Sequence, residues 1–221
     1  MIKTTQSLLI LFASLIISTQ GNAQEKAATK EIEIKQARVF DYDQRLGNNA
    51  QRLIGDVIVA HEGSVMWCDS AYLYGGSNSM DAFGNVHIIM KDTLNLYGDK
   101  LFYDGNTRIA KVNQNVKLID KKLTLYTDDL IYRRNEKIGE YFVWGKLVDS
   151  ANVLTSKKGF YYTDAREVIF YDSVVLVNKD HILRTDTLHY HTQFKTLDFN
   201  GPTTIVGDSS YMYAESGFHD T

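Results

Sequence analysis

The stretch Leu96-Tyr-Gly-Asp-Lys-Leu-Phe-Tyr103 decides the fold, because similar eight-residue stretches recur along the chain every 29 residues. The copies Leu125-Tyr-Thr-Asp-Asp-Leu-Ile-Tyr132 and Leu183-Arg-Thr-Asp-Thr-Leu-His-Tyr190 align with it without gaps. A unit of this length cannot bury its own apolar face, so we expect about six 29-residue repeats to stack in register around one elongated core. The last position of the unit holds Tyr74, Tyr103, Tyr132, Tyr161, Tyr190 and His219.

Two columns of the aligned repeats are apolar and are predicted to point inward. The first holds Trp67, Leu96, Leu125, Leu154, Leu183 and Met212. The second holds Leu73, Phe102, Ile131, Phe160, His189 and Phe218, with one histidine in an otherwise apolar row. Small residues and then polar, mostly acidic residues lie between the two columns, as in Gly98-Asp99, and this composition predicts a corner or bulge.

A second recurring piece precedes the first by about ten residues, as in Gly55-Asp-Val57 and Gly84-Asn-Val86. Glycine followed by Asp or Asn predicts a turn, and the alternating or β-branched runs that follow predict strands. The chain shows no sustained helical periodicity. The sequence therefore predicts an all-β protein.

The first 23 residues are predicted to be a secretory signal peptide, because a basic start and a short apolar run precede the small residues Gly21-Asn-Ala23. A membrane anchor would need a longer apolar run, of roughly 20 residues. We expect a polar leader with one edge strand near 32–41 within residues 24–52, and a repeat domain over 53–221. The chain could also be the N-terminal part of a longer protein.

Charge and composition argue against several functions. Removing Lys3 with the signal peptide leaves 23 basic residues against 27 acidic ones, which argues against a nucleic-acid-binding surface. The basic pairs Lys121-Lys122, Arg133-Arg134 and Lys157-Lys158 are interpreted as solvated loop charge. Because Cys68 is the only cysteine, it cannot form an intramolecular disulfide, and we expect an unreactive, partly covered thiol. No catalytic motif is present, so no enzyme activity and no cofactor are expected.

Three histidines and a row of aspartates are the candidate metal ligands in the sequence. His189 and His191 would project from one face of a strand and could bind a metal if His181 approached from a neighbouring strand. The favoured interpretation is that His189 fills a core position and His191 faces outward, with no metal. Asp99, Asp128 and Asp186 form a stacked row, but they lie one repeat apart and do not converge on a calcium or catalytic site.

The Gly-Asn-Val and Leu-x-(Ala/Gly)-Asp-x-Leu-x-Tyr pieces resemble the OstA-like family of periplasmic lipopolysaccharide-transport proteins, most clearly at residues 84–103. The tyrosine-rich strands resemble a Bacteroidetes-type member. The resemblance implies an elongated, twisted jelly roll of two facing antiparallel sheets, in a periplasmic protein that is not an enzyme. It further implies that lipopolysaccharide or lipid A is held by its acyl chains in an apolar slot. On this hypothesis the slot is lined by Trp67, Leu73, Leu96, Phe102, Leu125, Ile131, Leu154, Phe160 and Leu183.

The resemblance also implies a bridge between the inner and outer membranes. Expected partners are other transport proteins with OstA-like domains, joined by edge-strand pairing, or further copies of this chain assembled head to tail. The alternative is an exported β-solenoid, an adhesin-like or scaffold protein with a closed core. The apolar rows would have the same sequence in either case.

Overall fold

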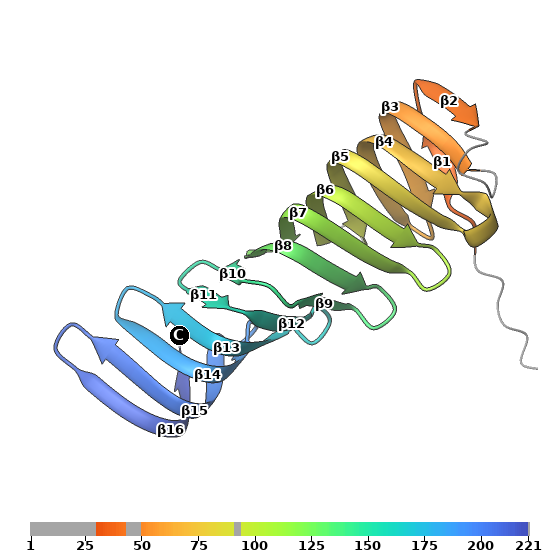
Figure 1. The fold of residues 1–221 in the computed structure, drawn as a ribbon. Helices are drawn as coiled ribbons and strands as arrows, with labels where there is room; N and C mark the ends of the chain where they lie inside the picture. The colour runs from red at the N-terminus through yellow and green to blue at the C-terminus, as the bar shows by residue number, and fades with distance from the viewer. Residues whose placement is uncertain (1–29, 43–49, 91–93, 221) are drawn as a thin grey trace, which may run out of the picture.

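The computed structural model describes residues 30–42, 50–90 and 94–220, so the predicted signal peptide at 1–23 lies outside the described residues. Within them the chain forms sixteen strands and one short 3₁₀ helix (Figure 1). This confirms the predicted all-β class. The elements are β1 (Glu33–Gln36), β2 (Val39–Tyr42), β3 (Ala50–His61), β4 (Ser64–Tyr74), η2 (Gly75–Ser77), β5 (Ser79–Met90), β6 (Leu94–Asp104), β7 (Ile109–Asp120), β8 (Leu123–Arg133), β9 (Ile138–Tyr141), β10 (Gly145–Val148), β11 (Val153–Ser156), β12 (Lys158–Tyr162), β13 (Glu167–Val177), β14 (His181–His191), β15 (Thr196–Gly207) and β16 (Tyr211–Asp220).

The strands form an elongated antiparallel array in which each long strand pairs with the next one along the chain. β9 and β10 pair with opposite halves of β8, so together they replace one long strand, and β11 and β12 replace the next. β1 and β2 pair with opposite halves of β3 in the same way. The predicted single edge strand near 32–41 is therefore two short strands.

A bulge divides each of β3, β5, β7, β13 and β15, and it bends the sheet so that its two halves face one another (Figure 1). In β5 the bulge contains Gly84 and Asn85, whose φ angles of 72° and 46° lie in the left-handed region. A Cβ on Gly84 would lie 2.3 Å from Oδ2 of Asp69, so a side chain here would strain the left-handed backbone and displace that carboxylate.

The bulges correct two details of the predicted architecture. The Gly-Asp and Gly-Asn pairs use their left-handed backbone inside long strands, and not in turns that precede strands. The two facing sheets are the two halves of one continuous sheet. The predicted corner at the small and acidic columns is confirmed, because the register of β6 against β7 shifts between Tyr97 and Lys100.

The core fills the space between the two halves of the sheet. On each side of a bulge the buried positions alternate along the strand, but the bulge changes which positions point inward. In β6, Leu94, Leu96 and Gly98 are buried before the bulge, and Leu101 and Tyr103 after it. The recurring tyrosines thus belong to the core from Tyr103 onward.

The repeat is interrupted at residues 142–144, between β9 and β10. Here Phe142 and Trp144 are more than half exposed, while the side chain of Tyr141 is buried. The ring of Tyr141 packs directly on Gly145 and Gly159, where an added Cβ would lie about 2.4–2.5 Å from ring atoms. The interruption therefore lies where β5 and β7 carry their bulges, and a tyrosine packed on two glycines fills the core beside it.

Candidate functional site

The predicted slot residues divide between the interior and the outer surface. Leu96, Leu125, Leu154 and Leu183 are fully buried between the two halves of the sheet, and Leu73 is 6% exposed. The predicted inward positions Trp67, Phe102, Ile131 and Phe160 instead lie on the outer face.

Two physical causes explain the misplaced residues. Phe102 and Ile131 follow the register shifts against β7, and Phe160 follows the break between β11 and β12, so strict alternation from the first column no longer holds. The first repeat is offset by one residue, because three residues separate β5 from β6 but only two separate β3 from β4. Met66 therefore occupies the inward position expected for Trp67.

The ends of the strands form two rows of turns that meet along a line, which we call the seam. The first turn row contains residues 62–63, 121–122 and 149–152. The second turn row contains residues 105–108, 134–137, 163–166 and 192–195. Side chains from the two rows bond to one another, so the seam is where the interior would open.

Hydroxyls of the recurring tyrosines bridge the seam to partners at nearly constant sequence separation. The hydroxyl of Tyr161 donates to Oδ2 of Asp120 at 2.6 Å, and that of Tyr190 donates to Asp149. The hydroxyl of Tyr103 lies 2.8 Å from Nδ1 of His61. These partners are 41 or 42 residues apart, and each pair joins the two halves of the sheet across the core.

Charged groups bridge the seam near its N-terminal end. Arg108 donates from Nε and from Nη2 to the two carboxylate oxygens of Glu62, and Arg134 donates to the backbone oxygens of His61 and Glu62. The bonds from Arg108 outweigh the effect of burial and lower the pKa of Glu62 to about 2. This end of the seam is held by an ionised carboxylate.

The same bridges perturb the acids and phenols farther along. Burial opposes ionisation of Asp149, but bonds from Tyr190 and from the N–H groups of Ala151 and Asn152 outweigh it and lower the pKa of that carboxyl. Burial, reinforced by the bond to Asp120, raises the pKa of Tyr161. Tyr161 is therefore a neutral donor, and Asp149 an ionised acceptor for Tyr190, at neutral pH.

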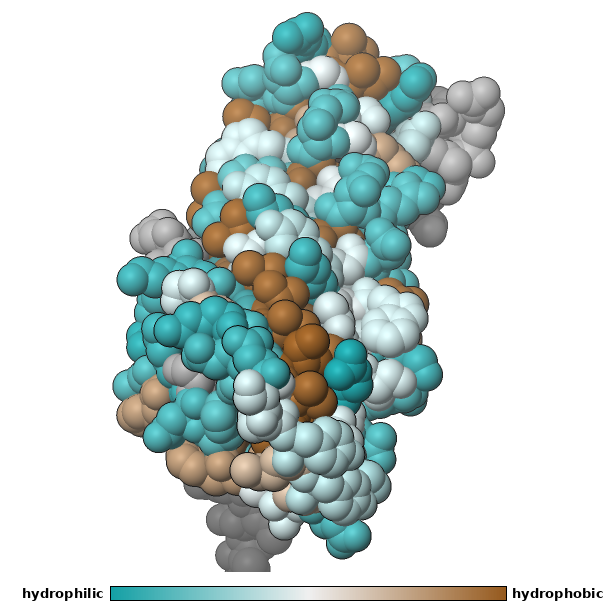
Figure 2. Space-filling view, turned by 90° about the vertical axis from the view of Figure 1, so that its left-hand side faces the viewer, coloured by the Kyte–Doolittle hydropathy of each residue, from teal (hydrophilic) through white to brown (hydrophobic). Residues whose placement is uncertain are grey.

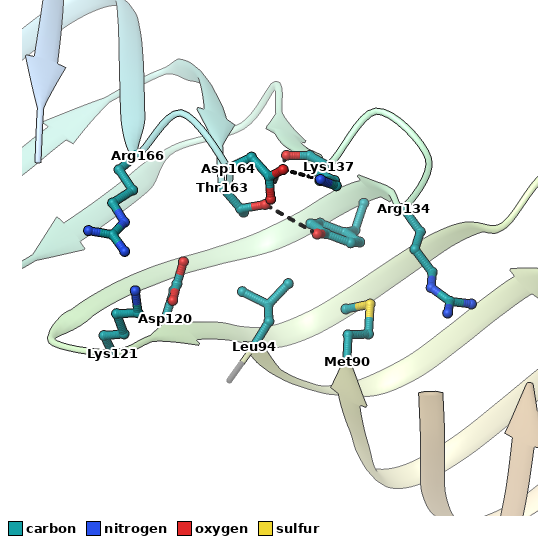
Figure 3. A pocket seen from close by; sticks show the side chains of 10 residues that line it. Met90, Leu94, Asp120, Lys121, Arg134, Lys137, Thr163, Asp164 and Arg166 are labelled. Atoms are coloured by element: carbon teal, nitrogen blue, oxygen red, sulfur yellow. Dashed lines mark hydrogen bonds and ion pairs between the residues drawn. The ribbon is translucent and has the colours of Figure 1, made fainter. Parts of the chain in front are cut away.

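Two cavities open at the middle of the seam, on either side of the bond between Tyr161 and Asp120. Figure 3 shows the first, which is lined by Met90 and Leu94 together with Lys121, Arg134 and Arg166. The second encloses about 330 Å³ and adds Lys122 and Lys195. Together they are lined by six basic residues (Lys121, Lys122, Arg134, Lys137, Arg166 and Lys195) and three acidic ones (Asp120, Asp149 and Asp164).

The three acids at these cavities are already engaged, Asp120 and Asp149 by tyrosines and Asp164 by Lys137. Lys137 and Arg134 are engaged as well, by Asp164 and by the carbonyls of His61 and Glu62. Lys121, Lys122 and Arg166 therefore make the cavities suited to anions, although the chain as a whole has a formal charge of −3. Lys121, Lys122 and Arg134, expected from the sequence to be solvated loop charge, converge with Arg166 at these cavities. That convergence depends on which turns face each other across the seam.

Apolar side chains are exposed at the β16 end of the array. Within the described residues β16 pairs only with β15, and Tyr211, Met212, Tyr213 and Phe218 are each more than half exposed. Figure 2 shows hydrophobic surface continuing as a narrow stripe between hydrophilic flanks in the lower half of the molecule. This end offers both an unpaired strand edge and apolar surface.

The remaining sequence candidates do not form a catalytic site. Asp99 accepts a bond from Asn115, and the stacked acids stay one repeat apart along the outer corner. Cys68 is buried, and burial raises the pKa of its thiol to about 11. No helix within the described ranges has the length and apolar character of a membrane span.

The favoured interpretation of His189 as a core residue is wrong, and the approach of His181 that a three-histidine metal site would need does not occur. His189 does not fill a core position, since it lies on the outer face beside His191. His181 lies at the opposite end of β14, against His219.

The profile of the OstA-like protein family matches residues 29–186. The chain belongs to this family. The repeat of this OstA-like protein continues past the matched region through β15 and β16. Among solved structures, it is similar to LptH from Pseudomonas aeruginosa, described as the LptA-homologous periplasmic component of the conserved lipopolysaccharide transport device. The two are 18% identical, with 50% of this chain and 80% of that chain covered and a TM-score of 0.44. No curated protein matches the chain.

Proposed function

We propose that this OstA-like protein is a periplasmic carrier of lipopolysaccharide-type lipids, and forms part of a bridge from the inner to the outer membrane. Acyl chains would occupy the space between the two halves of the sheet, and the phosphorylated head group would lie at the basic cavities. Family membership favours this function. The observation that carries it is the seam, where basic residues and the buried side chains of Met90, Leu94 and Leu123 line the same cavities.

The interior is closely packed, since Leu96, Leu125 and Leu154 are fully buried, so a lipid must separate the two turn rows to enter. Each polar bridge at the seam is worth only about 0.5–1.5 kcal/mol net. Each methylene of an acyl chain gains about 0.8 kcal/mol on leaving water. Since the chains would cover the apolar rows that separation exposes, burial of one long acyl chain can offset the loss of several bridges.

The head group would be recognised by charge. Lys121, Lys122 and Arg166 converge on one cavity, and phosphate is the anionic group of lipid A that arginine and lysine bind best. The Tyr161–Asp120 bond lies between the two cavities, so separating it would join them into one larger opening.

The edge of β16 is the proposed docking surface for the next member of the bridge. A partner strand would add to the unpaired edge by antiparallel or parallel pairing, and its apolar face would cover Met212 and Phe218. The occupant would be another OstA-like domain or a second copy of this chain, so that the interior of one continues into the next.

The head-group claim is tested by titrating purified protein with labelled lipopolysaccharide and measuring the bound fraction by size exclusion. We expect saturable binding, weakened at least tenfold by combining Lys121→Gln, Lys122→Gln and Arg166→Gln. The matched control is Lys111→Gln with Lys117→Gln, which removes charge from the outer face of β7. Equal binding by the two sets of variants would contradict the proposed head-group site.

A closed repeat scaffold is the second candidate, and the close packing of the interior favours it. In that case the wild-type protein would not bind lipopolysaccharide saturably. The same titration therefore separates the two functions.

A further inference from the structure

A compact cluster of two histidines and two carboxylates lies on the outer face of β13, β14 and β15. His189 and His191 alternate along β14, so their side chains share one face. Glu167 of β13 pairs directly with His191, and Asp198 of β15 pairs directly with His189. Sheet register therefore brings four potential ligands together from three strands, in a region the lipid hypothesis does not use.

The atoms of this cluster have the spacing of ligands around one ion. Nε2 of His189 lies 3.3 Å from Oε2 of Glu167, and Nδ1 of His191 lies 3.3 Å from Oε1. The ligand atoms of the three residues all lie within 4.8 Å of one another. Two donors at about 2.1 Å from a tetrahedral zinc ion are about 3.4 Å apart, which matches the two measured separations.

Asp198 sets the tautomer and the ring orientation of His191. Nε2 of His191 lies 3.0 Å from Oδ2 of Asp198, so the Nε2–H of a neutral ring donates to that carboxylate. Nδ1 then directs a lone pair at Oε1 of Glu167, which is also an acceptor. Two acceptors that face each other at this distance need a cation between them, either a second proton on the ring or a metal ion.

The surroundings suit a metal ion. The side chains of His189, His191 and Glu167 are 32%, 23% and 36% exposed, so an ion can reach them from solvent while neighbouring strands hold them in place. A carboxylate that accepts from the far nitrogen of a ligating histidine is the usual support for such a ligand. Two imidazoles and one carboxylate form a donor set typical of zinc and similar divalent transition metals.

We propose that Glu167, His189 and His191 bind one divalent transition-metal ion of the zinc class, with Asp198 positioning His191. The bound ion would join β13 to β14 and leave a coordination position open to water. The proposal is independent of lipid transport.

The test uses mature protein without a polyhistidine tag, stripped with a chelator and titrated with zinc chloride by calorimetry. We expect saturable binding of one ion per chain and a rise in melting temperature with zinc concentration. His189→Gln, His191→Gln and Glu167→Gln should each weaken binding at least tenfold, and Asp198→Asn by about 10- to 100-fold. His181→Gln is the matched control, because it removes a histidine from the other end of β14 and should leave affinity unchanged.

Circular dichroism establishes that each variant keeps its β structure. A second measurement needs no variant: cobalt(II) added to the wild-type protein should give the visible absorption of a tetrahedral ion, and zinc should displace it. The proposal is overturned if millimolar zinc binds without saturation, or if the His189 and His191 variants bind zinc as tightly as the wild type. A loss of binding in His181→Gln that equals the loss in His189→Gln would also overturn it.

Discussion

The hydroxyl of Tyr161 donates a 2.6 Å hydrogen bond to the carboxylate of Asp120, which lies 41 residues earlier and on the opposite turn row. This bond closes the sheet on itself at the middle of the seam. Tyr190 and Asp149 repeat it one unit later. The recurring tyrosine thus has two roles, since its ring fills the core and its hydroxyl holds the two halves of the sheet together.

Replacing Tyr161 by Phe removes this bridge and leaves the ring in place. We expect the free energy of unfolding to fall by about 1–3 kcal/mol, because Asp120 loses its partner in a partly buried position. Urea denaturation measures the change. The control is Tyr162→Phe on the outer face, which should change stability by less than about 0.5 kcal/mol.

The pKa of Glu62 predicts how stability depends on pH. Since Arg108 lowers the pKa of this carboxyl from 4.5 to about 2 in the folded protein, its contribution is complete above pH 4.5 and is lost as the pH falls toward 2. The difference in melting temperature between the wild type and Glu62→Gln should shrink over that window. A difference that stays constant down to pH 2.5 would show that the ionised carboxylate adds no stability.

The change of inward positions at the bulge predicts unequal effects within one strand. Leu125→Ala in β8 should cost about 2–5 kcal/mol, because it leaves a cavity at a fully buried position. Ile131→Ala, six residues later on the outer face, should cost about 1 kcal/mol or less. If the two positions alternated strictly and both pointed inward, the two variants would lose similar stability. Denaturation of Leu125→Ala and Ile131→Ala therefore distinguishes strict alternation from a change of face within β8.

The exposed end of the array predicts a charge-sensitive assembly. Met212→Lys places a charge on the apolar face of β16, where Met212 is 58% exposed, and should weaken self-association at least tenfold in sedimentation velocity. Phe142→Lys, at a similarly exposed position in the middle of the array, should not. If neither variant changes the sedimentation of a self-associating wild type, the β16 edge is not the contact.

The fold could be predicted from the sequence because the 29-residue repeat shows where each strand and each corner falls. The spacing of the Leu96–Tyr103 unit indicated stacked β units, and the Gly98-Asp99 column indicated the corner. The outward direction of Phe102 and Phe160 could not be predicted by alternation, because the register shift between Tyr97 and Lys100, and the break between β11 and β12, exchange the two faces.

The contacts at the seam and in the histidine cluster could not be predicted from the sequence, for another reason. Both join residues whose proximity depends on strand register and on the curl of the whole sheet. Tyr161 meets Asp120 across the core, and His189 meets Glu167 from a neighbouring strand, 22 residues away. No local pattern distinguishes these acids from the others on the surface.

The central claim, that lipid occupies the space between the two halves of the sheet, is tested most directly by photocrosslinking in cells. A photoreactive phenylalanine analogue would replace Phe170 or Phe199, which point inward, and Phe102 or Phe160, which lie on the outer face. The account predicts lipopolysaccharide adducts at Phe170 and Phe199 and none at the outer pair. Adducts at neither inward position, in a protein that is folded and exported, would contradict it.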